Sequence, residues 1–206
     1  MVQNQVPGWA QWFPFMVAVS LVGGPGGFGF LFGLLMVEEG ETGARTALAV
    51  TPVRPSVLIV TRTLVATAWM CVSPLTSIYV MNATWQAIDL RFVQWLGVVV
   101  PLALLTPALA LATPALAGDK VRALAVFKGL SFVTLMPLAT FFIRADAPYR
   151  RLFLVSPTGW VVESYRAFLD ADSAGYWWAA GGAAYAVVLL VGAVQLIRRN
   201  VYTLHR

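Results

Sequence analysis

The sequence is poor in charged residues, and this shortage excludes a soluble protein. Only 11% of the 206 residues are charged and 59% are hydrophobic, whereas soluble domains carry ~25% charged residues. So few charges cannot cover a water-soluble globule, and the composition therefore indicates an integral membrane protein. The net charge of +5 does not indicate nucleic-acid binding, because the basic residues lie mostly between or beside apolar runs, as membrane topology requires.

The residues and motifs of common enzyme and metal sites are also lacking. The single cysteine, Cys71, lies in an apolar run, and the single histidine is His205, so neither an internal disulfide nor a zinc site of three or four ligands is expected. The chain has no phosphate-binding loop, no G-x-S-x-G turn and no H-E-x-x-H motif. No carboxylate falls in the middle of an apolar run, which argues against proton-coupled transport. We therefore expect no catalytic residue and no metal site in this chain.

Five apolar segments are long enough to cross a bilayer, which takes ~20 helical residues. We expect an all-α integral membrane protein with a single transmembrane domain over residues 1–206. The predicted spans cover residues 12–37, 56–81, 92–117, 121–143 and 176–197.

Small residues and prolines mark the first and third predicted spans. Residues 24–29 match G-x-G-x-x-G, but a dinucleotide site would need a preceding strand and an aqueous setting. The alternative is a broken or closely packed membrane helix, because small residues let helix backbones approach. Pro101, Pro107 and Pro114 each remove a backbone donor, so we expect the third span to be covered by protein.

Two cations lie about two turns inside predicted spans. Arg62 is close enough to the end of the second span for its long side chain to reach the interface. Lys128 has two interpretations: its side chain extends back to the turn near Lys120, or it is a charge that lines a cavity.

An amphipathic helix is predicted over residues 157–170, after Ser156 as its N-cap and with Pro157 in its first turn. Its apolar face includes Tyr165, and its polar face includes Thr158 and Glu163. We expect this helix to lie in the membrane interface or to enter the membrane part-way.

The distribution of basic residues predicts the orientation. With five spans, nine Lys and Arg residues lie on the side of the C-terminus and five on the other side. This favours a cytoplasmic C-terminus, and it places residues 38–55 in the cytoplasm and the loop 144–175 outside.

The polar stretch between the first two spans resembles a known motif. Residues 41–52, ETGARTALAVTP, resemble the pattern E-x-G-T-L-E-x-L-L-V-[ST]-P of ABC-2 type transporter permeases. The residues at 44–46 depart from that pattern. The family normally has six spans and five are predicted here, so we expect this chain to lack the first one.

The resemblance implies that residues 39–50 form a cytoplasmic coupling helix that binds a P-loop ATPase subunit. The residues carried over to that contact are Glu39, Glu41, Thr42, Gly43, Arg45, Leu48, Thr51 and Pro52. Glu38 is interpreted as a solvated loop residue.

The resemblance also implies the setting of the protein. It implies a bacterial exporter in the inner cell membrane that moves a drug, lipid or other amphiphile, with ATP and Mg²⁺ on the partner ATPase and a second permease subunit in a homo- or heterodimer. The alternative is a non-transporting assembly or scaffold subunit; a membrane-embedded enzyme and a secondary transporter are weaker hypotheses.

Overall fold

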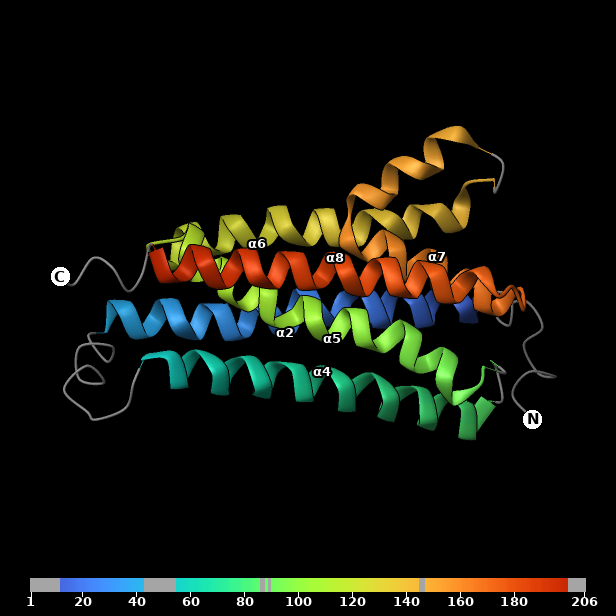
Figure 1. Cartoon of the computed structure of the whole chain (residues 1–206), viewed down its shortest axis with the longest axis horizontal. Coiled ribbons are helices and arrows are strands. Elements are labelled where there is room, and N and C mark those ends of the chain that lie inside the picture. The colour runs from blue at the N-terminus through green and yellow to red at the C-terminus, as the bar shows by residue number, and fades with distance from the viewer. Residues whose placement is uncertain (1–11, 43–54, 86–87, 89, 145–146, 200–206) are drawn as a thin grey trace.

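A bundle of long helices forms the body of the protein, and a short helical arm projects from one end of it (Figure 1). The computed structural model describes residues 12–42, 55–85, 88, 90–144 and 147–199, and all regular elements in these ranges are helical. The all-α prediction is thus confirmed. The long helices are α2 (Phe13–Glu41), α4 (Pro55–Trp85), α5 (Phe92–Leu116), α6 (Lys120–Leu135) and α8 (Ala174–Ile197).

Four of the described helical segments are long and apolar enough to cross a membrane. They are α2, α5, α8 and the segment Lys120–Phe142, which joins α6 to the 3-10 helix η2 (Met136–Phe142). Helix α4 has 31 residues, and ~20 suffice for a crossing. The protein is therefore a multi-pass membrane protein, and the fifth span, on α4, stays a prediction.

Helix α5 lies at the centre of the bundle. Its most apolar stretch of 18 residues is 72% buried, whereas the corresponding stretches of the other three candidate spans are 22–33% buried. Its most extensive contacts are with α8 and α2. Pro101, Pro107 and Pro114 are all buried, which confirms that the helix with three missing backbone donors is covered by protein.

Close packing explains two glycines of the first span, Gly29 and Gly33, and the helix is not broken. Helix α2 continues through Pro25. A Cβ atom added at Gly29 would lie 2.8 Å from the Cβ atom of Leu109, and one added at Gly33 would lie 2.6 Å from that of Thr113. The two glycines are four residues apart, on one face of α2, and they allow its backbone to touch α5.

The fourth predicted span, 121–143, is a helix that tightens toward its end. Asp119 caps its start, since its carboxylate accepts the backbone N–H of Arg122 at 2.8 Å. The α-helix ends at Leu135, and the chain continues as the 3-10 helix η2, in which Pro137 is buried. A proline cannot donate to the carbonyl four residues earlier, which accounts for the change in helix type at this point.

Helix α7 (Pro157–Leu169) begins at the predicted proline, after the 3-10 helix η3 (Pro148–Val155). Two details differ from the prediction. The Ser156 hydroxyl does not cap the helix; it lies 2.8 Å from the Thr158 hydroxyl, with which it shares a hydrogen bond. Thr158, predicted on the polar face, is fully buried and donates to the Thr134 carbonyl at 2.6 Å. A short hydroxyl side chain can be buried once it is hydrogen-bonded.

Candidate functional site

Charged side chains from three helices meet at one end of the bundle. The last turns of α2 carry Glu38, Glu39 and Glu41, the third turn of α4 carries Arg62, and α6 begins at Lys120. Figure 1 shows the C-terminal end of α2 beside the N-terminal ends of α4 and α6. We call these five residues the acidic clamp, because acids of α2 bind cations of α4 and α6.

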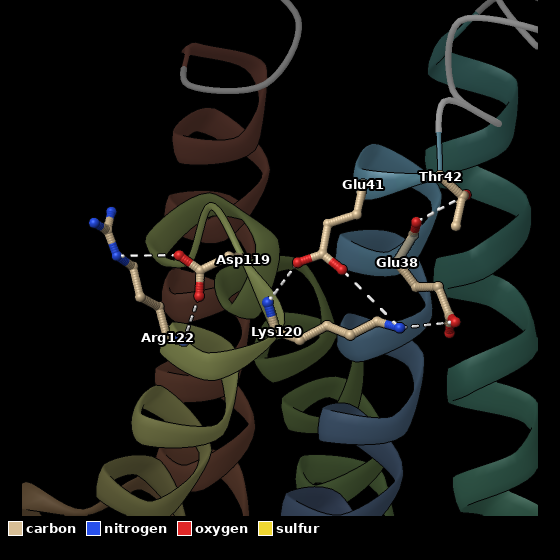
Figure 2. A network of polar contacts seen from close by, with 6 residues as sticks. All are labelled: Glu38, Glu41, Thr42, Asp119, Lys120 and Arg122. Atoms are coloured by element: carbon tan, nitrogen blue, oxygen red, sulfur yellow. Dashed lines mark hydrogen bonds and ion pairs between the residues drawn. The ribbon is translucent and has the colours of Figure 1, made fainter.

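Lys120 binds two of the acids (Figure 2). Its ammonium nitrogen lies 2.9 Å from a carboxylate oxygen of Glu38 and 4.0 Å from one of Glu41. Its backbone N–H donates to the other Glu41 oxygen at 2.9 Å. Glu41 thus satisfies one of the backbone donors at the start of α6 that have no partner within that helix. The two acids together fix the end of α2 against α6.

Arg62 binds the third acid. Its Nη2 atom donates to both carboxylate oxygens of Glu39, at 2.6 Å to Oε2. These two side chains are 26% and 29% exposed, while those of Lys120 and Glu38 are both 46% exposed. Because water screens the Arg62–Glu39 pair less, we expect it to contribute more to stability than the Lys120 pairs.

The coupling-site residues from the sequence lie partly in this clamp. Glu39 and Glu41 belong to α2, which runs unbroken from Phe13 to Glu41, so no separate helix begins at residue 39 and the helix extends beyond the predicted span 12–37. Thr42 ends the helix, and its hydroxyl donates to the Glu38 carbonyl at 2.9 Å. The remaining predicted contacts lie outside the described residues: Gly43, Arg45, Leu48, Thr51 and Pro52.

Lys128 lies apart from the clamp, on the exposed face of α6. Leu124 and Phe132, one turn before and one turn after it, are also exposed. This face is not part of the packed interior of the chain. A cavity around Lys128 would therefore need walls from another chain or from lipid.

The ion pairs of three clamp residues were not predicted from the sequence. Glu38 was interpreted as a solvated residue, yet it binds Lys120. Arg62 was expected only to reach the interface, and Lys120 only to mark a turn. The available signal was charge complementarity, since the predicted topology places the acids and both cations on the same side of the membrane.

The comparisons with known proteins give one match. The family model described as "Fluoroquinolones export permease protein Rv2686c-like" matches residues 2–194. No curated protein and no solved structure matches the chain. The match agrees with the resemblance to ABC-2 permeases, with the apolar helices and with the role of a transport subunit. From a match that covers nearly the whole chain, we conclude that this protein belongs to the Rv2686c-like family of fluoroquinolone export permease proteins.

Proposed function

We propose that this chain is the membrane subunit of an ATP-driven exporter and that residues 38–52 receive the force from a separate P-loop ATPase. The observation that carries this proposal is the acidic clamp. The segment 43–54 connects α2 to α4 in the sequence, and the helix ends on both sides of it are joined to each other by Glu39 and Arg62. Lys120 adds α6 to the same group.

The clamp supports transmission of movement because it links ends of helices, not their middles. A push on segment 43–54 would act on α2 and α4 together, and the pairs to Lys120 would pass it to α6. Packed helices with two alternative arrangements are the usual elements of such changes. The clamp supports a coupling role for Glu39 and Glu41, and the motif resemblance supports the other proposed coupling residues: Thr42, Gly43, Arg45, Leu48, Thr51 and Pro52. ATP and Mg²⁺ are proposed to be held by the partner.

A second permease subunit is proposed to complete the transport path. The exposed face of α6 around Lys128 is apolar, with Val121, Leu124 and Phe132 exposed in the single chain. Lipid or a second permease subunit can cover such a face. A neighbouring permease would also supply the missing walls around Lys128, whose charge is costly to leave in lipid.

The proposed substrate is an aromatic amphiphile of the fluoroquinolone type, which is the class in the family's description. The proposed location is the inner cell membrane, with the C-terminus in the cytoplasm, as the basic residues indicate. In that orientation the acidic clamp faces the cytoplasm, where an ATPase subunit and its ATP are available.

The test is ATP-dependent transport by a reconstituted complex. The tagged chain is purified with the ATPase subunit that binds it, and the complex is placed in vesicles with its ATPase side outward. We expect ATP to drive accumulation of a fluoroquinolone inside the vesicles. The control complex carries an ATPase whose phosphate-loop lysine is replaced, and it should accumulate none.

Two results would contradict the proposal. Purification without any P-loop ATPase would favour the non-transporting scaffold subunit. Accumulation driven by a proton gradient without ATP would make the chain a secondary transporter.

A further inference from the structure

We propose that a cavity between η3, α7 and α8 binds the carboxylate of an aromatic substrate, at the end of the bundle opposite the acidic clamp. This inference rests on the proposed export function and assigns it a binding site. The cavity has a volume of about 680 Å³, and pockets for drug-sized ligands measure ~300–1,000 Å³. Four of its lining residues carry the argument: Arg150, Arg151, Glu163 and Trp178.

A nearly buried ion pair forms part of the cavity wall. The Arg150 Nε atom donates to Glu163 Oε1 at 2.8 Å, and its Nη2 atom donates to Glu163 Oε2. Both side chains are 15% exposed. The two parallel hydrogen bonds fix the guanidinium and carboxylate planes relative to each other. Their charges balance, so this pair supplies shape and polarity without a net charge.

Arg151 supplies the unbalanced charge. It lies next to Arg150 in η3, it is exposed, and it lines the same cavity. The ionised side chains that line the cavity are Arg150, Arg151 and Glu163, which gives a net charge of +1 when the lining charges are summed. A planar guanidinium binds a carboxylate through two hydrogen bonds, so the cavity suits an anionic group of that shape.

The walls around this charge are held in place. The Trp160 indole N–H donates to the Leu154 carbonyl at 2.9 Å, and the Tyr185 hydroxyl donates to the Val155 carbonyl at 2.8 Å. These bonds fix the end of η3 to α7 and α8. The Trp160 and Trp178 rings lie 5.7 Å apart, which positions the aromatic wall. The cavity is therefore formed before a ligand arrives.

Trp178 selects an aromatic ligand over other carboxylates. Trp178 lines the same cavity as Arg151, together with Pro148 and Leu154. A fluoroquinolone carries a carboxylate on a flat aromatic ring, so it can meet the guanidinium and the indole at the same time. An anionic phospholipid shares the negative group, but it has no aromatic ring for Trp178.

Binding to the purified permease tests the site separately from transport. Titration calorimetry compares a fluoroquinolone with its methyl ester, which lacks the negative charge. We expect Arg151→Gln to weaken binding of the acid on the order of tenfold, the size of a lost charge-assisted hydrogen bond. The ester should bind the wild type and Arg151→Gln equally. Trp178→Leu should weaken both compounds, with its thermal unfolding temperature measured to establish that it folds.

The matched control is Arg91→Gln, an exposed arginine before α5 that does not line the cavity; its binding of the acid should be unchanged. Equal binding of the acid by Arg151→Gln and the wild type would overturn the proposal. So would an equal loss for acid and ester. Arg151→Gln could instead weaken binding of phosphatidylglycerol vesicles and leave binding of the acid unchanged. That result would overturn the proposal and make the cavity a lipid headgroup site. Failure of ATP-driven transport with intact binding would count against the export function alone.

Discussion

At the residue scale, substitutions of Glu39 can distinguish two roles: pairing with Arg62 within the chain and contact with the ATPase subunit. Glu39→Arg places a second cation beside Arg62 and removes a partly exposed pair. We therefore expect the free energy of unfolding to fall by roughly 1–3 kcal/mol, which thermal unfolding of the purified protein detects as a lower midpoint temperature. The double variant Glu39→Arg/Arg62→Glu restores opposite charges and should recover most of that loss. Measurement of unfolding and of ATPase co-purification on the same samples tests both roles.

The two readouts distinguish the outcomes for Glu39. Recovery of stability together with ATPase binding would establish an internal role for the pair. Recovery of stability without recovery of binding would show that Glu39 itself contacts the ATPase. No recovery of stability would contradict the pair. Lys120→Gln is the matched control: its pairs are more exposed to water, so the expected loss of stability is smaller than that of Glu39→Arg.

The sequence predicted that the charges of the clamp lie on one side of the membrane, but not that they meet or how they pair. The acids and cations were placed on one side of the membrane by counting charges. The partners themselves are 23 residues apart for Glu39 and Arg62, and 82 apart for Glu38 and Lys120. Such pairs depend on which helices are neighbours in the bundle, and hydrophobic periodicity does not contain that information.

At the element scale, the contact between α2 and α5 depends on the absence of side chains. A Cβ atom at Gly33 would lie 2.9 Å from the Ala110 carbonyl oxygen, a backbone atom that cannot move aside by rotation. We therefore expect Gly33→Ala to destabilise the protein by about 1–3 kcal/mol, the usual cost of overpacking. Thermal unfolding of the detergent-solubilised protein measures this loss.

Gly27→Ala is the control for that substitution. It lies in the same helix, and an added Cβ atom there would have nothing within 4 Å. Both substitutions gain helix propensity, by up to ~1 kcal/mol. Gly27→Ala should thus be neutral or stabilising, and an equal loss in both variants would contradict the packing explanation.

Helix existence was predictable at this scale, whereas helix ends were not. Apolar runs and Pro157 predicted the α-helices nearly in place, because length and hydropathy dominate in a membrane, whereas the 3-10 helix η3 was not predicted. The extension of α2 to Glu41 was missed, since Glu38 was interpreted as a loop residue and Glu39 and Glu41 were assigned to a separate coupling helix. In the structure these acids pair with Arg62 and Lys120. Pro25 did not end α2, because the packed neighbours hold the helix together.

At the scale of the whole molecule, the orientation of the bundle can be tested with the single cysteine. In a Cys71→Ser background, new cysteines are placed at Gly118, between α5 and α6, and at Tyr149, in the projecting η3. With the clamp in the cytoplasm, a membrane-impermeant maleimide should label Tyr149→Cys in intact cells. It should label Gly118→Cys only after permeabilisation, and the opposite pattern would invert the proposed topology.

The central position of α5 has a consequence for the biosynthesis of this protein. Its most extensive contact is with α8, the last helix of the described chain. Until the ribosome has produced residues 174–197, one side of a helix with three prolines has no protein neighbour. Between the synthesis of α5 and that of α8, the centre of the nascent bundle is therefore incompletely covered. Completion of the bundle's core therefore waits for α8.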